Sequence, residues 1–195
     1  MLYKFGRLIL RLLFHTFYDI EVIGSDNLPV TGSVIVCANH SSLLDPVLLG
    51  AFIKRPLCFM AKQELFNFKP LGALLTALGA FPVNREAVEI TTLKRALDIL
   101  KNAQVMGIFS QGGRMDTVEV DVEAGKAGVA LFATRSSSPV VPVGIKGSFR
   151  PFTKVTVRLG EPIYFEEHYG KKLRTPELAV LTKKIMVEIK TLASK

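Results

Sequence analysis

The sequence of 195 residues lacks several features that would assign it to a common class of protein. No uncharged run reaches the roughly 20 residues that a helix needs to span a bilayer, and the apolar stretch 70–84 is interrupted by glycine and proline. The two cysteines are not arranged as a zinc ligand set, and there is neither a dense basic tract nor an aromatic RNA-binding signature. We therefore expect no transmembrane helix, no metal site and no nucleic-acid partner.

Internal repeats, low-complexity tracts and linkers are also absent, which favours a single folded domain. Cys37 and Cys58 lie in apolar runs, as expected for reduced thiols in a core, although one disulfide is compatible with the count. The 25 Lys and Arg residues outnumber the 17 Asp and Glu residues, giving a net charge of +8. This excess favours an anionic partner such as a phosphorylated substrate or an anionic lipid surface.

Residues 1–18 contain no acidic group. Their basic residues recur at helical spacing and form a narrow polar stripe on an otherwise apolar segment: Lys4, Arg7, Arg11 and His15. This pattern predicts an amphipathic helix that lies in a membrane interface, with its lysine and arginine side chains reaching lipid headgroups. The alternative is a helix that docks on the core of the protein itself. We accordingly divide the chain into a membrane-associating helix, 1–18, and one domain, 19–195.

Apolar runs typical of strands alternate with helical patterns along the rest of the chain. The strands are expected near 20–23, 33–37, 57–61, 80–83, 105–109, 140–145 and 154–159, and the helices over 46–53, 71–78, 87–103, 125–135 and 176–193. The alternation predicts an α/β fold: a single domain with a mostly parallel central sheet flanked by helices. In such sheets, binding sites form at the carboxyl ends of the strands.

The most informative segment follows the second expected strand and reads Asn39-His40-Ser41-Ser42-Leu43-Leu44-Asp45-Pro46. Histidine is the usual general base at neutral pH, and a nearby carboxylate can fix its tautomer. Pro46 is a favourable first helical residue, so the pattern predicts a helix that begins there with Asp45 as its N-cap. The alternative is that Asp45 only caps this helix while His40 is an ordinary loop residue.

Three later segments each place a basic residue just after an expected strand: Lys62, Arg85 and Arg114. The guanidinium group of arginine suits phosphate, and the adjacent Gly112 and Gly113 would let the backbone approach a ligand closely. Three cations at corresponding strand ends, beside a histidine and a carboxylate, indicate an anion-binding site.

Taken together, these motifs resemble those of the glycerophospholipid acyltransferase family, most closely its bacterial 1-acylglycerol-3-phosphate acyltransferases. The family's first motif, NHxSxxD, is matched by Asn39, His40, Ser42 and Asp45. Later motifs of the family are matched by Lys62, Glu64 and Leu65, by Phe81 and Arg85, and by Val141, Pro142 and Val143. Order and spacing agree from about residue 30 to residue 160.

The resemblance implies that His40, oriented by Asp45, deprotonates the free hydroxyl of a lysophospholipid. That oxygen would attack the thioester of acyl-carrier protein or acyl-CoA, which are co-substrates, and give phosphatidic acid. Arg85, Arg114 and Lys62 would bind the phosphate of the acceptor. The resemblance also implies supporting residues in the site loops (Asn39, Ser42, Gln111, Gly112 and Gly113), no cofactor, and a peripheral position on the cytoplasmic face of the cell membrane.

The third motif departs from the family pattern Phe-Pro-Glu-Gly-Thr-Arg, because this chain reads Phe109-Ser110-Gln111-Gly112-Gly113-Arg114. A neutral amide replaces the carboxylate, which leaves glycerol-3-phosphate or another lyso-lipid open as the acceptor. Two readings outside the family also remain: a serine hydrolase that uses Ser41 or Ser42, and a non-catalytic lipid-binding protein. The hydrolase lacks a G-x-S-x-G elbow, since the run Gly107–Gly112 is one residue too long.

Overall fold

The computed structural model describes residues 2–83, 90–109, 111, 120–123, 125 and 127–195. All seven expected strands are confirmed within this part of the chain. They are β1 (Asp19–Ile23), β2 (Val34–Ala38), β3 (Leu57–Lys62), β4 (Phe81–Val83), β5 (Val105–Phe109), β6 (Val140–Gly147) and β7 (Lys154–Leu159).

The strands form one sheet in the order β1-β7-β6-β2-β5-β3-β4. Neighbouring strands are parallel except for β6 and β7, which pair antiparallel. The sheet is therefore mostly parallel, as predicted, with β1 and β7 running opposite to the other five strands. Its carboxyl edge gathers the loops that follow β2, β5 and β3, which are the loops that carry the predicted site residues.

All five residues of the central strand β2 are buried, and its sequence Val-Ile-Val-Cys-Ala is a continuous apolar run. Such a run is expected for a parallel strand that is covered on both faces. Alternate side chains of β2 enter two separate cores: Ile35 and Cys37 lie in one, and Val34, Val36 and Ala38 lie in the other.

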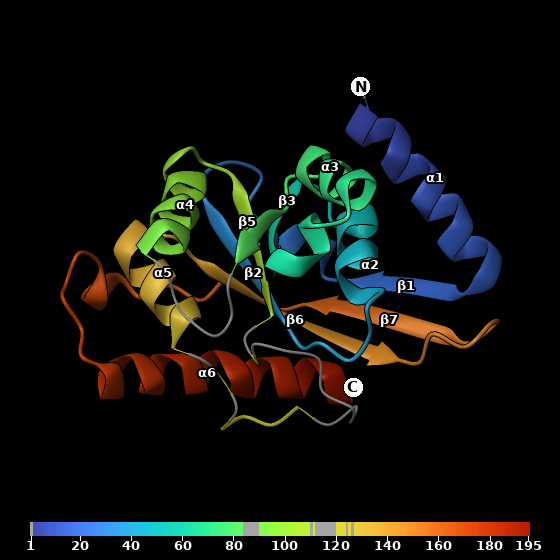
Figure 1. Ribbon diagram of the computed structural model, residues 1–195. Helices are drawn as coiled ribbons and strands as arrows, with labels where there is room; N and C mark the ends of the chain where they lie inside the picture. The colour runs from blue at the N-terminus through green and yellow to red at the C-terminus, as the bar shows by residue number, and fades with distance from the viewer. Residues whose placement is uncertain (1, 84–89, 110, 112–119, 124, 126) are drawn as a thin grey trace.

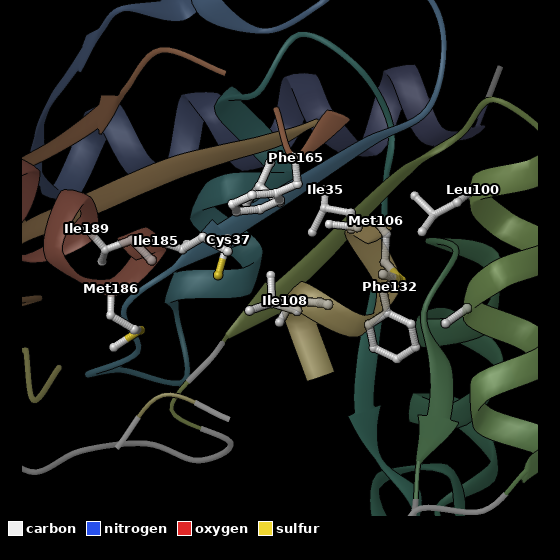
Figure 2. Packing of buried hydrophobic residues seen from close by; sticks show 14 of the residues in the cluster. Ile35, Cys37, Leu100, Met106, Ile108, Phe132, Phe165, Ile185, Met186 and Ile189 are labelled. Carbon is white, nitrogen blue, oxygen red and sulfur yellow. The ribbon is translucent and has the colours of Figure 1, made fainter. Parts of the chain in front are cut away.

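The helices cover both faces of the sheet (Figure 1). They are α1 (Leu2–Phe17), α2 (Asp45–Phe52), α3 (Lys69–Ala77), α4 (Ile90–Lys101), α5 (Gly128–Ser136) and α6 (Thr175–Ser194). One core joins the sheet to α4, α5 and α6, and Figure 2 shows Ile185, Met186 and Ile189 of α6 facing Cys37 of β2 within it. The second core joins the opposite face to α1 and α2. The predicted α/β architecture is thus confirmed, and both cysteines are thiols.

Helix α1 lies beside α2 (Figure 1), and its arginine side chains are turned toward that helix. The Nε atoms of Arg7 and Arg11 donate hydrogen bonds to the carbonyl of Ala51 at 2.8 and 2.7 Å. Burial there, and then the charge of Arg11, lower the pKa of Arg7. The prediction that these two side chains reach lipid headgroups is therefore wrong, because they bind carbonyl groups that the end of α2 leaves without partners inside the helix.

The opposite face of α1 is apolar and exposed. Its large exposed side chains are Phe5, Leu8, Ile9, Leu12, Leu13 and Phe17, whereas Phe14 is buried in the core that α1 shares with α2. The helix therefore docks on the protein, as the second alternative from the sequence has it, and the membrane contact of its exposed face stays a prediction. Within the described residues, no helix has the length and hydropathy needed to cross a membrane.

Candidate active site

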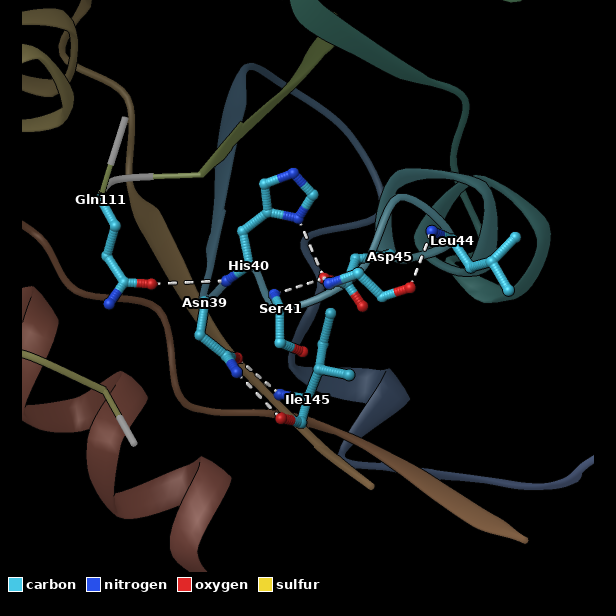
Figure 3. Close-up of polar contacts among 8 residues, drawn as sticks. Asn39, His40, Ser41, Leu44, Asp45, Gln111 and Ile145 are labelled. Carbon is cyan, nitrogen blue, oxygen red and sulfur yellow. Dashed lines mark hydrogen bonds and ion pairs between the residues drawn. The ribbon is translucent and has the colours of Figure 1, made fainter. Parts of the chain in front are cut away.

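His40 and Asp45 form a buried hydrogen-bonded pair at the carboxyl edge of the sheet. His40 follows β2 by two residues and is 7% exposed, and Asp45 is fully buried. The Nδ1 atom of His40 lies 2.9 Å from Oδ2 of Asp45, and Figure 3 shows the other ring nitrogen turned away from this carboxylate. Since a carboxylate oxygen accepts, Nδ1 carries the proton and Nε2 keeps its lone pair. The pair thus has the tautomer that a general base requires.

The carboxylate of Asp45 also organises the loop before it. Its Oδ2 atom accepts the backbone N–H groups of Ser41 and Ser42 at 2.8 and 2.7 Å, while its Oδ1 atom is buried without a hydrogen-bond partner. Helix α2 begins at Asp45, and the position before it, Leu44, has helical dihedral angles. The prediction that Asp45 is the N-cap of a helix starting at Pro46 is therefore wrong by one residue, because its side chain binds backward to the loop rather than forward to the helix.

Asn39 fixes the start of the same loop to the neighbouring strand β6. Its Nδ2 donates to the carbonyl of Ile145 at 2.9 Å, and its Oδ1 accepts the N–H of Ile145 at 2.7 Å (Figure 3). Both residues are buried, so the Asn39 amide supplies hydrogen bonds to two main-chain groups of Ile145 that would otherwise be buried without a partner. The predicted supporting role of Asn39 thus has a structural basis.

A stack of aromatic rings supports the imidazole from β5 and β3. The ring of His40 is stacked on Phe109 with centroids 4.2 Å apart, and Phe109 is stacked on Phe59 at 5.7 Å. Gly107 makes room for this arrangement, since a Cβ atom there would lie 2.3 Å from the ring of Phe59. Phe109 was not singled out from the sequence; its position at the end of a strand was visible, but its pairing with Ala38 of β2 was not.

Gln111 approaches His40 from the other side. Its Oε1 atom is 3.5 Å from the backbone nitrogen of His40 and accepts that N–H in a long hydrogen bond (Figure 3). A main-chain N–H can only donate, so it fixes which way the amide is turned. The Nε2 atom, which is buried, has no hydrogen-bond partner. The structure therefore places the Gln111 side chain beside His40, while its role in the site stays a prediction.

The remaining predicted residues are placed less fully. Lys62 ends β3 at the same edge of the sheet, where its Nζ atom lies 2.9 Å from Glu64 and both side chains are more than half exposed. Ser42 accepts the N–H of Leu44 at 3.2 Å through its hydroxyl oxygen. Four further residues of the predicted site lie outside the described part of the chain: Arg85, Gly112, Gly113 and Arg114.

The described contacts do not link the imidazole to a serine. No hydrogen bond joins the ring of His40 to the hydroxyl of Ser41 or Ser42 among the described residues, so these do not form the nucleophile–base pair of a hydrolase. Over the same described ranges, no group of three or more His, Cys, Asp and Glu side chains is positioned to hold a metal ion.

A separate cavity of about 450 Å³ lies beside β4, α3 and α4. Gln63, Thr76, Phe81 and Arg95 are among the residues that line it, whereas His40 and Asp45 are not. The candidate site is therefore defined by its hydrogen bonds and ring contacts rather than by this cavity.

A mostly parallel α/β sheet with a buried histidine–carboxylate pair at its carboxyl edge is an arrangement suited to an enzyme that uses a general base. A family model described as Acyltransferase matches residues 19–146, well over half of the chain. The chain belongs to this acyltransferase family.

Proteins with curated names agree with this placement. The chain is 30% identical to the 1-acyl-sn-glycerol-3-phosphate acyltransferase of Bacillus subtilis (strain 168), over 100% of this chain and 98% of that protein. It is also 30% identical to the enzyme of that name from Streptococcus pneumoniae, over 81% of this chain and 60% of that protein. The crystal structure of the 1-acyl-sn-glycerophosphate (LPA) acyltransferase PlsC from Thermotoga maritima superposes with a TM-score of 0.69 at 28% identity, covering 96% of this chain and 78% of that one.

The bond pair between Asn39 and Ile145 yields a test of stability. Asn39→Ala leaves the N–H and C=O of Ile145 buried without partners, and we expect the free energy of unfolding to fall by about 2–4 kcal/mol, measured by chemical denaturation. Asn102→Ala is the matched control, because it removes one exposed bond to the carbonyl of Asp98 and should cost less than about 0.5 kcal/mol. Equal effects of the two substitutions would contradict this role of Asn39.

Proposed function

We propose that the protein transfers a fatty acyl group from an acyl thioester to the free hydroxyl of 1-acylglycerol-3-phosphate and so forms phosphatidic acid. The observation that carries the proposal is the buried hydrogen bond between His40 and Asp45, which leaves Nε2 of the imidazole available as a base. The names of the relatives from Bacillus subtilis and Streptococcus pneumoniae support the choice of acceptor. The thioester donor, acyl-carrier protein or acyl-CoA, is part of the proposal.

The reaction needs one proton carrier. Nε2 of His40 takes the proton from the acceptor hydroxyl as its oxygen attacks the carbonyl carbon of the thioester. The tetrahedral intermediate then collapses, the C–S bond breaks, and the leaving thiolate receives the proton from His40. Asp45 accepts the hydrogen bond from Nδ1–H of His40 throughout and stabilises the transient imidazolium. The proposal assigns no step to a metal or a cofactor.

Binding of the acceptor phosphate is assigned to Lys62, Arg85 and Arg114. Lys62 lies at the carboxyl edge of the sheet with its ammonium group exposed and paired with Glu64. An exposed pair of this kind contributes little free energy, so a phosphate dianion can replace the carboxylate as the partner of Lys62. The two arginines are proposed on the sequence motif alone.

The outward face of α1 is proposed to contact a membrane from the cytoplasmic side. Six large apolar side chains are exposed on it, and the acceptor and product of the proposed reaction are lipids. Because Arg7 and Arg11 are bound to α2, the contact depends chiefly on apolar area rather than on attraction to anionic headgroups. The protein would then be a peripheral membrane enzyme that does not span the bilayer.

Removal of the base tests the reaction. We expect His40→Ala to lower turnover on lysophosphatidate by about 10²–10⁴-fold, the usual contribution of a general base, without unfolding the protein. Turnover is measured with purified protein, acyl-CoA or acyl-carrier protein, and a panel of lyso-acceptors. His168→Ala is the control, because that imidazole lies in the short helix Glu166–His168, away from the candidate site. Full activity of His40→Ala would refute the proposed mechanism.

Restoration of the family carboxylate tests the role of position 111. We expect Gln111→Glu to change kcat/KM for lysophosphatidate by about 1–2 orders of magnitude, because it adds a charge beside the His40 backbone while keeping an oxygen that can accept its N–H. Gln104→Glu makes the same change at an exposed position before β5 and is the control. If Gln111→Glu has unchanged kinetics at both saturating and limiting acceptor, position 111 does not influence the reaction.

The exposed face of α1 predicts how the protein binds vesicles. We expect Phe5→Ser with Leu12→Ser to weaken sedimentation with phospholipid vesicles by about tenfold or more, since each side chain loses its transfer to an apolar phase. Raising the salt concentration should weaken binding less than this pair of substitutions does. Val30→Ser, at an exposed apolar residue between β1 and β2, should have no effect. Binding that is abolished by salt and indifferent to Phe5 and Leu12 would rule out an apolar contact.

A further inference from the structure

The arginines of α1 bind the end of α2 that lies opposite Asp45. In addition to the two bonds to Ala51, Nη1 of Arg7 donates to the carbonyl of Lys54 at 2.9 Å. The last carbonyls of a helix have no partner within the helix and carry its negative partial charge, so cations are favourable there. Hydrogen bonds from charged donors are also the stronger kind. Arg7 and Arg11 therefore fix the carboxyl end of α2.

Aromatic contacts extend the same seam between the two helices. Phe52, the last residue of α2, lies with its ring 5.6 Å from the guanidinium carbon of Arg11 and meets the rings of Phe14 and His15 edge-on. The hydroxyl of Tyr3 donates to the carbonyl of Gly50 at 3.4 Å. One face of α1 thus packs against α2, while the opposite face is exposed.

Helix α2 is a short connection between this seam and the candidate site. It has eight residues, which corresponds to a length of about 12 Å, and Asp45 is its first residue. Figure 1 shows α2 standing beside α1, with its first turn toward the carboxyl ends of the central strands. A displacement of the carboxyl end of so short a helix is transmitted to its first turn.

The position of the Asp45 carboxylate depends strongly on the helix backbone. Its Oδ2 atom binds only to the loop 40–42 that it orders, and its Oδ1 atom is buried without a partner. A buried carboxylate oxygen without a hydrogen bond is unfavourable. A small movement of Asp45 that let water bind its Oδ1 atom would therefore lower the free energy of that group. The observed position is maintained only while both ends of α2 are held.

We propose that Arg7 and Arg11 are positioning residues for the reaction: by fixing α2 they hold the Asp45 carboxylate at hydrogen-bond distance from His40. Helix α1 then has two roles carried by different residues, since its outward face contacts the lipid phase and its inward face maintains the catalytic pair. Release of α1 from α2 lowers the turnover number even when substrate is supplied in solution. The kinetic form of this inference rests on the proposed acyl transfer.

The test compares Arg7→Gln with Arg11→Gln, singly and together, against Arg55→Gln. Arg55 is a matched control, because its guanidinium group donates three bonds of 2.6–2.9 Å to the carbonyls of Pro29, Gly32 and Ala103, in loops that precede β2 and β5. The same kind of hydrogen bond is thereby removed at the opposite edge of the sheet from His40. The acceptor is a short-chain lysophosphatidate used below its micelle concentration, so that vesicle binding does not limit the rate.

We expect the double variant to lose about tenfold or more in kcat while KM changes by less than about twofold, because the displaced group acts in the chemical step rather than in binding. Arg55→Gln should leave both constants nearly unchanged. A double substitution to lysine, which keeps the positive charge at the end of α2, should recover part of the loss. Unchanged kcat in the glutamine double variant, or an equal loss in Arg55→Gln, would overturn the proposal.

A second measurement does not depend on activity. The proton on Nδ1 of His40, hydrogen-bonded to Asp45, gives a low-field imidazole resonance that His40→Ala identifies by its absence. We expect this resonance to persist in Arg55→Gln and to broaden or disappear in the Arg7 and Arg11 double variant at unchanged circular dichroism; its persistence there would overturn the proposal.

If the double variant does not fold, Arg11→Gln alone, which retains both Arg7 bonds, must show the same change in smaller measure. Failure of the wild-type protein to acylate any lyso-acceptor would count against the proposed function, whereas this resonance decides the positioning role by itself.

Discussion

The hydrogen bond between His40 and Asp45 depends on groups contributed by four separate parts of the chain. The loop after β2 supplies the imidazole, and α2 supplies the carboxylate. Phe109 of β5 supports one face of the ring, and Asn39 ties the loop to β6. Phe109 and Ile145 lie far from His40 in the sequence, so these supports of the pair come together only when β5 and β6 are the neighbours of β2 in the sheet.

The described part of the site contains one buried negative charge and several neutral polar groups. Asp45 carries the charge, whereas Asn39, which begins the loop, and Gln111, which binds the backbone of His40, are amides. A carboxylate at position 111 would place a second anion near the loop that joins His40 to Asp45, where like charges repel. The amide keeps the contact to the backbone of His40 without that repulsion. This difference from the family motif therefore affects the electrostatics of the site more than its shape.

The strands and helices were predictable from the sequence because their signals are local. Buried runs such as Val34–Ala38, and the helical pattern expected over 176–193, are read from neighbouring residues. The partner of Asn39 was not predictable, since Ile145 is 106 residues away and is brought near only by the strand order. The inward direction of Arg7 and Arg11 was misjudged for a related reason: amphipathic spacing identifies two faces of a helix but not the face that meets the protein. Helix α2 begins one residue earlier than predicted, at Asp45, because the Asp45 side chain binds to preceding residues rather than capping its own helix.

The apolar side of α1 also governs how the purified protein behaves. Six large hydrophobic side chains on one exposed surface exceed what a monomer in water usually tolerates as a continuous patch. In buffer without detergent, we expect copies of the chain to associate through this surface. An oligomeric state measured under those conditions would reflect contacts between the exposed apolar faces of α1 rather than a functional assembly. We expect added detergent to dissociate such oligomers.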